Sequence, residues 1–145
     1  MSGKSDILLG VMFRQFGTYH RARVNALARR GDISVLGIEI DPADTTYAWS
    51  RTSEAVSFRH TVVCRNAVER SGSELWRRVF AVLGQEAPRV LAVPGWGDPA
   101  ALAGISWASQ NGVPVILMSD STALDEPRHW WKEAIKSRVL GTADA

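Results

Sequence analysis

Short apolar runs alternate along the chain with segments of helical periodicity, and this alternation constrains the fold more than any other feature. The expected strands are 7–13, 33–40, 58–64, 89–93 and 113–118. The expected helices are 19–30, a stretch after 71, 99–111 and a last one that starts near 125–127. This order predicts an α/β fold, a Rossmann-like parallel β-sheet flanked by helices. The continuously apolar run 113–118 is expected to be buried on both faces.

Capping signals place two of the helix boundaries. Asp98 supplies an N-cap, and Pro99 follows it at the position where a helix needs no N–H. Gly112 is expected to end that helix. Ser71 and Glu74 have the spacing of a capping box at the start of another helix. The mostly polar segment 42–56 shows no period and is expected to be an irregular excursion.

Composition excludes several classes of protein. The 145 residues are 46% hydrophobic and 22% charged, which is the balance of one globular domain rather than a disordered chain or a coiled coil. A formal net charge of +2 does not predict a nucleic-acid partner. The lone cysteine, Cys64, excludes an internal disulfide and is expected to be a buried thiol in a reducing compartment.

No apolar run approaches the ~20 residues that span a bilayer, and the N-terminus lacks the pattern of a signal peptide. The expected location is therefore the cytoplasm. The basic first helix leaves open a peripheral contact with the inner face of the membrane. The segment 140–145 resembles a helix end that turns toward a further strand, which predicts that 1–145 is a domain truncated before a second one.

Ligands of an open parallel sheet bind beyond the carboxyl ends of its strands. Four segments are expected there: 14–21, 41–46, 94–97 and 119–128. The sequence therefore places its candidate site on these segments.

The first segment opens a basic stretch, because residues 14–30 contain five arginines, one histidine and no acid. Gly17 and Thr18 precede a helix N-terminus, where backbone N–H groups favour a phosphate. The functional interpretation is that Arg14, His20 and Arg21 meet a phosphate or a sugar acid. The structural alternative is a solvated basic helix with His20 packed in its first turn.

The loops after the later strands offer further candidates. Trp96, beside Gly95, either stacks on a sugar or base or folds back onto the sheet edge. Asp120, between Ser119 and Ser121, either accepts a proton or binds a sugar hydroxyl, or else caps its loop.

Arg128 and Lys132 lie one turn apart on the last expected helix and either face the same cleft or simply cover a helix surface. Asp41 either holds a ribose hydroxyl or forms a turn with Pro42.

Several catalytic signatures do not occur in the sequence. The loop after the first strand is neither a dinucleotide fingerprint nor a Walker loop, because Gly17 is its only glycine and no Gly-Lys-Ser/Thr follows. The three histidines lie far apart without metal-ligand spacing. The nucleophile elbow of the α/β-hydrolases is also lacking.

Taken together, several segments resemble family 4 glycosyltransferases of the GT-B fold. The order and spacing of loose motifs over most of the chain carry the likeness. These motifs are the strand 7–13, Gly17-Thr18-Tyr19-His20-Arg21, Val93-Pro94-Gly95-Trp96, the strand 112–118 with Ser119-Asp120-Ser121, the set Asp125, Arg128, Trp131, Lys132, Glu133 and Lys136, and the end 142–145. Where many relatives place a histidine after the fourth strand, this sequence has Gly95-Trp96, so no catalytic histidine is assigned there.

The resemblance implies an N-terminal, acceptor-side domain, with the nucleotide-sugar donor bound by a missing C-terminal domain. The whole enzyme would transfer a sugar to a glycan, lipid-linked or small-molecule acceptor without a metal. His20 and Asp120 are the candidate catalytic groups. The candidate substrate-binding positions are Arg14, Gly17, Thr18, Tyr19, His20, Arg21, Gly95, Trp96, Ser119, Asp120, Ser121, Arg128 and Lys132.

Two other functions stay open from the sequence. One alternative hypothesis is that the chain is a non-catalytic subunit, which docks onto a separate catalytic partner through exposed tryptophans. It is alternatively a flavodoxin-like binder of a nucleotide or flavin, which the lack of a glycine fingerprint disfavours.

Overall fold

A five-stranded sheet forms the centre of the chain, with the strand order β3-β2-β1-β4-β5 and every neighbouring pair parallel. The computed structural model describes residues 7–43, 56–70, 72–118 and 141. The strands are β1 Leu8–Phe13, β2 Ser34–Glu39, β3 Arg59–Val62, β4 Val90–Val93 and β5 Val115–Leu117. This arrangement confirms the predicted Rossmann-like α/β fold.

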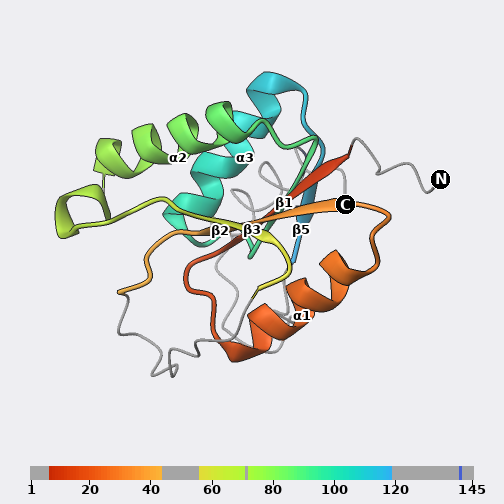
Figure 1. Cartoon of the computed structure of the whole chain (residues 1–145). Helices are drawn as coiled ribbons and strands as arrows, with labels where there is room; N and C mark the ends of the chain where they lie inside the picture. The colour runs from red at the N-terminus through yellow and green to blue at the C-terminus, as the bar shows by residue number, and fades with distance from the viewer. Residues whose placement is uncertain (1–6, 44–55, 71, 119–140, 142–145) are drawn as a thin grey trace, which may run out of the picture.

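Helices cover both faces of the sheet (Figure 1). They are α1 Thr18–Arg29, α2 Gly72–Glu86 and α3 Pro99–Asn111, with a short 3-10 helix, η1 Ala67–Arg70, ahead of α2. Helix α1 lies on one side of the sheet, whereas α2 and α3 lie together on the other (Figure 1). The predicted helices 19–30 and 99–111 and the helix after 71 are thereby confirmed.

The central strand β1 contributes to both hydrophobic cores. Met12 is fully buried in the core under α2 and α3, and its neighbour Val11 is buried in the core under α1. Successive side chains of a strand point to opposite faces, so a strand covered on both sides must be apolar throughout. This requirement explains why the sequence of β1 is apolar without interruption.

The predicted caps of α3 are confirmed. The Asp98 side chain accepts hydrogen bonds from the Ala100 and Ala101 amides at 2.7 and 3.3 Å. Gly112 ends the helix with φ +64°, a conformation that glycine adopts without a steric penalty. At α2, Ser71 lies outside the described residues, and the Glu74 carboxylate accepts hydrogen bonds from Arg77 at 2.6 and 3.0 Å.

The expectation for 113–118 was partly wrong. The strand covers only Val115–Leu117, and Ile116 is 37% exposed rather than buried. The physical reason is that β5 ends the described sheet and pairs with β4 alone. Most of the excursion 42–56 and the last expected helix lie outside the described residues. Within the described part of the chain, no helix has the length and apolar character needed to cross a bilayer.

Gly37 of β2 is predicted to be intolerant of a side chain. A Cβ there would lie 2.5 Å from the Phe58 ring and 3.0 Å from the Phe16 ring. Gly37→Ala should therefore lower the free energy of unfolding by about 1–3 kcal/mol. The matched control is Gly84→Ala in α2, where a Cβ meets no atom within 4 Å.

The control should raise the free energy of unfolding by up to about 1 kcal/mol, because alanine favours helix over glycine. Urea unfolding followed by circular dichroism measures both variants. Equal stability of the two would contradict the packing of Phe58 and Phe16 over β2.

Candidate functional site

The order of the strands places a switch point between β1 and β4. The chain proceeds from β1 to β2 and β3 on one side, and to β4 and β5 on the other. The loops that follow β1 and β4 therefore run in opposite directions at the carboxyl edge of the sheet and leave a crevice between them. Open α/β sheets bind their ligands in this crevice. Here the two loops are 14–17 and 94–98.

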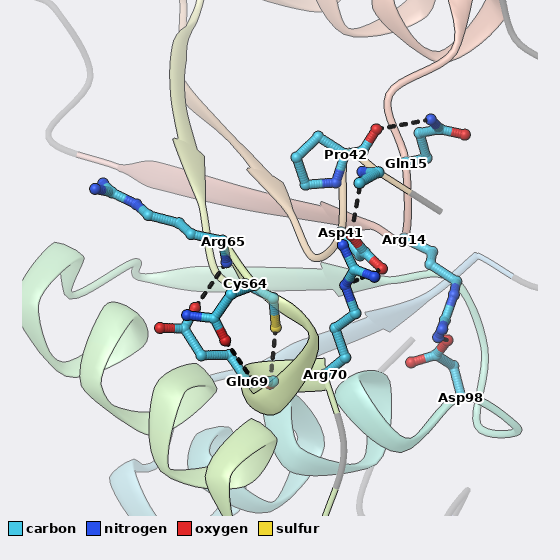
Figure 2. Close-up of polar contacts among 11 residues, drawn as sticks. Arg14, Gln15, Asp41, Pro42, Cys64, Arg65, Glu69, Arg70 and Asp98 are labelled. Atoms are coloured by element: carbon cyan, nitrogen blue, oxygen red, sulfur yellow. Dashed lines mark hydrogen bonds and ion pairs between the residues drawn. The ribbon is translucent and has the colours of Figure 1, made fainter. Parts of the chain in front are cut away.

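An ion pair connects these two loops. Arg14 Nη1 lies 2.9 Å from Asp98 Oδ2, and the two side chains are 43% and 23% exposed (Figure 2). The other carboxylate oxygen of Asp98 caps α3. Because this pair is open to solvent, an arriving anion can compete with Asp98 for the guanidinium.

The loop after β1 is held by side chains at its Phe16 peptide. The Phe16 amide donates to Glu39 Oε1 at 2.9 Å, and Arg21 Nε donates to the Phe16 carbonyl at 3.2 Å. Gly17 follows as the N-cap of α1, and no side chain of the described residues caps that helix. The N-terminus of α1 is therefore presented without a competing carboxylate in its first turn.

Glu39 is a buried carboxylate with a histidine partner, and sequence reasoning did not identify either residue. It is 4% exposed, and one of its oxygens lies 3.0 Å from His60 Nε2 of the neighbouring strand. Burial opposes its ionisation, but hydrogen bonds from His60 and the Phe16 amide, with the charges of His60 and Arg21, outweigh burial and lower its pKa. A buried acid at the end of β2 thus holds the loop after β1.

A second buried acid, Asp41, ties the end of β2 to the segment after β3. Its carboxylate lies 2.9 Å from Arg70 Nε and accepts a hydrogen bond from the Ala43 amide at 3.1 Å (Figure 2). Gln15 Nε2 donates to the Pro42 carbonyl at 3.1 Å, so the loops after β1 and β2 are also joined. Asp41 does form the expected turn, but its partner Arg70 was not foreseen.

The segment after β3 is organised around Glu69. Its carboxylate accepts from the Arg65 amide at 2.7 Å and lies 3.3 Å from Arg78 of α2. Its backbone carbonyl accepts from Cys64 Sγ at 3.0 Å (Figure 2). Burial, with the nearby charges of Asp41 and Glu69, raises the pKa of the Cys64 thiol despite Arg78 and Arg70. Cys64 is the buried thiol that the sequence predicted, and its protonated form is unreactive.

The other candidates on α1 take different environments. Thr18 is exposed, and Tyr19 is 59% exposed with the Arg23 guanidinium 5.3 Å from its ring centre. The His20 ring stacks on Phe13 with ring centres 3.9 Å apart. This packed position is the one that the solvated-helix interpretation of the sequence predicts. Arg14, Gly17 and Arg21 are the candidates that the fold gathers around the loop after β1.

After β4, Gly95 has φ +130°, a conformation that favours glycine, and Trp96 is half-buried. Five candidates lie outside the described residues: Ser119, Asp120, Ser121, Arg128 and Lys132. Their roles stay predictions. Within the described ranges, no cluster of three or more His, Cys, Asp or Glu side chains has the arrangement of a metal site.

Comparisons with known proteins show the fold. The chain matches no protein-family model and no curated protein sequence. Among solved structures it is similar to UDP-GlcNAc 2-epimerase from Methanocaldococcus jannaschii, with 14% identity and a TM-score of 0.58. The match covers 94% of this chain but only 38% of that structure. The neighbour has a GT-B-like Rossmann fold, so the architecture is supported, while membership of glycosyltransferase family 4 stays a prediction.

The two roles of Asp98 are separable by mutation. Asp98→Asn keeps a capping oxygen and removes the charge that holds Arg14, so it should lower the free energy of unfolding by no more than about 1 kcal/mol. Asp98→Ala removes the cap as well and should cost about 1 kcal/mol more. Urea unfolding measures both losses. A larger loss for Asn than for Ala would contradict the assignment of Asp98 as the cap of α3.

Glu39 predicts a pH-dependent stability. The pKa of Glu39 in the folded chain lies below its ordinary value of 4.5. The stability that its negative charge contributes is therefore fully present above pH 4.5 and is lost as the pH falls through the lowered pKa. Glu39→Gln should lower the free energy of unfolding by about 1.5–3 kcal/mol at pH 7. The difference from wild type should shrink as the pH falls below 4.5 and through the lowered pKa of Glu39, because the wild-type carboxyl then also becomes protonated.

Urea unfolding at pH 7 and at a pH below the lowered pKa of Glu39 measures this difference. Glu74→Gln is the control, because that carboxylate lies at the surface with Arg77 and should change stability little at either pH. A pH-independent loss for Glu39→Gln would show that its charge does not hold the loop.

Proposed function

We propose that this chain is the N-terminal, acceptor-side domain of an enzyme that acts on nucleotide sugars, with glycosyl transfer as its reaction. The observation that carries the proposal is the Arg14–Asp98 pair across the switch point between β1 and β4. This pair supports the proposal because the Arg14 side chain is partly exposed at the point where sheets of this topology bind ligands.

The electrostatics of the crevice favour a phosphate or an acidic sugar. Arg14 faces it from one loop, and the N-terminus of α1, which no carboxylate of the described residues caps, adds partial positive charge. Arg21 is held nearby by its bond to the Phe16 carbonyl. A planar guanidinium forms two parallel hydrogen bonds with phosphate or carboxylate oxygens, so Arg14 would both bind and orient such a group.

The structural neighbour supports a carbohydrate-related role. Its name identifies an enzyme of a nucleotide sugar, and this chain corresponds to 38% of its length. In the proposal, a second domain holds the nucleotide-sugar donor, and the present domain holds the acceptor in the cleft between them. Bound in this way, the acceptor loses little further entropy as it approaches the donor.

The proposal assigns positioning and charge stabilisation to the described residues. Arg14 would neutralise the anionic group of the substrate, and Glu39 would keep the loop of Arg14 in place through the Phe16 amide. His20 and Asp120 stay the candidates for proton transfer. Nucleotide and acceptor groups are the only ligands that this scheme requires, and a metal is not part of it.

A second candidate function is epimerisation of a nucleotide sugar, which the name of the structural neighbour favours. The protein isolated at its native length distinguishes the two. With UDP-GlcNAc and a mixture of acceptors, proton NMR should show release of UDP if the enzyme is a transferase. Conversion to an epimeric UDP-sugar without release of UDP would identify an epimerase instead.

Binding to the crevice is testable on the 145-residue chain. Titration with GlcNAc 1-phosphate should shift the backbone amide signals of residues 14–21 and 94–98. Arg14→Ala should weaken that binding about tenfold, which is the loss of one charge-assisted contact. Arg29→Ala is the matched control, because this exposed arginine lies in the last turn of the same helix. Shifts confined to other parts of the chain would contradict the proposal.

A further inference from the structure

We propose that the groove between β3 and α2 is a second anion site, separate from the switch-point crevice, that binds a small phosphate-bearing molecule. The groove encloses about 380 Å³ and is lined by β3, the segment after it and the exposed side of α2. Small-molecule sites in proteins have volumes of about 300–1,000 Å³. The groove therefore has room for a phosphate with a small organic body.

Arginine dominates the charged lining of this groove. Arg65, Arg77 and Arg78 line it, and the only acid among its described lining residues is Glu86. Glu86 forms an ion pair with Arg59 of β3, while Arg77 pairs with Glu74 and Arg78 with Glu69. Among the described residues of the lining, the guanidinium of Arg65 therefore carries the charge that no carboxylate compensates. The interior therefore favours an anion over a cation.

The three arginines differ in how firmly they are held, which suits a binding site. Arg78 donates from Nε to the Val63 carbonyl at 3.1 Å, so its guanidinium is oriented before any ligand arrives. The Arg65 backbone is fixed by the Glu69 carboxylate, while its side chain extends away from that contact (Figure 2). In the described part of the chain, no carboxylate pairs with the Arg65 guanidinium.

Arg77 is the arginine that an anion would bind by displacing its present carboxylate partner. It pairs with Glu74 one turn earlier, and its side chain is 65% exposed. The pair is open to solvent on the Arg77 side, so a phosphate can reach the guanidinium and exchange with Glu74. Glu74 already accepts two hydrogen bonds from Arg77, so a phosphate has to replace both of them with its own oxygens.

The remaining lining is suited to the organic body of such a ligand. Val62, Ala81 and Val82 supply apolar surface, while Thr61 and Gln85 supply groups that hydrogen-bond hydroxyls. A sugar phosphate has this combination of an anion, hydroxyls and a small apolar surface. The phosphate has two sources, a soluble metabolite or a lipid headgroup, and the test separates them.

The test uses glucose 6-phosphate and phosphatidylglycerol vesicles as probes of the whole chain. Glucose 6-phosphate should shift the amide signals of Thr61, Arg65, Ala81 and Gln85. The double variant Arg65→Ala/Arg77→Ala should weaken the binding that these groove signals report at least about tenfold. The variant Arg14→Ala, in the crevice, should leave the affinity of this groove unchanged, so failure of one site is distinguishable from failure of the other.

The exposed double variant should keep the unfolding temperature of wild type within a few degrees, which a thermal melt checks. Sedimentation with phosphatidylglycerol vesicles, lost in the double variant, would identify the lipid headgroup as the source of the phosphate. Saturable binding of glucose 6-phosphate alone would identify a soluble ligand. No saturable shift of the groove signals with either probe, or groove shifts that survive in the double variant, would overturn the proposal.

Discussion

Every part of this domain depends on the need to cover both faces of a parallel sheet. Parallel strands are joined by crossover segments, and helices bury the apolar side chains that each strand sends to its two faces. In this chain α1 covers one face, and α2 with α3 covers the other. The direction of the crossovers reverses between β1 and β4, which places the loops after these strands on opposite sides of one crevice.

The carboxyl edge is stabilised by a few acids that each hold two groups. Asp98 caps α3 and pairs with Arg14, Glu39 holds the Phe16 amide and His60, and Asp41 holds the Ala43 amide and Arg70. Such sharing couples neighbouring loops, because loss of one carboxylate releases both of its partners. The position of Arg14 in the crevice therefore depends on acids of β2 and the loop after β4, as well as on its own loop.

This arrangement leaves guanidinium groups facing solvent at two separate places. Arg14 lies at the switch point, where open α/β sheets bind their ligands. Arg65, Arg77 and Arg78 line the groove beside the edge strand β3. The two places are on different strands and share no described residue, so one domain has room for a substrate at the first and another anion at the second.

The sequence by itself determined the elements, because their signals are local. Apolar runs placed the strands within a few residues, and the Asp98 cap with Gly112 placed both ends of α3. Only the tertiary structure decided the strand order and hence the pairs Arg14–Asp98 and Glu39–His60. It also decided that β5 lies at an end of the described sheet with Ile116 exposed. The physical reason is the distance along the chain over which each interaction acts. A helix cap or an apolar period acts within one or two turns, whereas Arg14 and Asp98, 84 residues apart, meet only after the strands have paired in their final order.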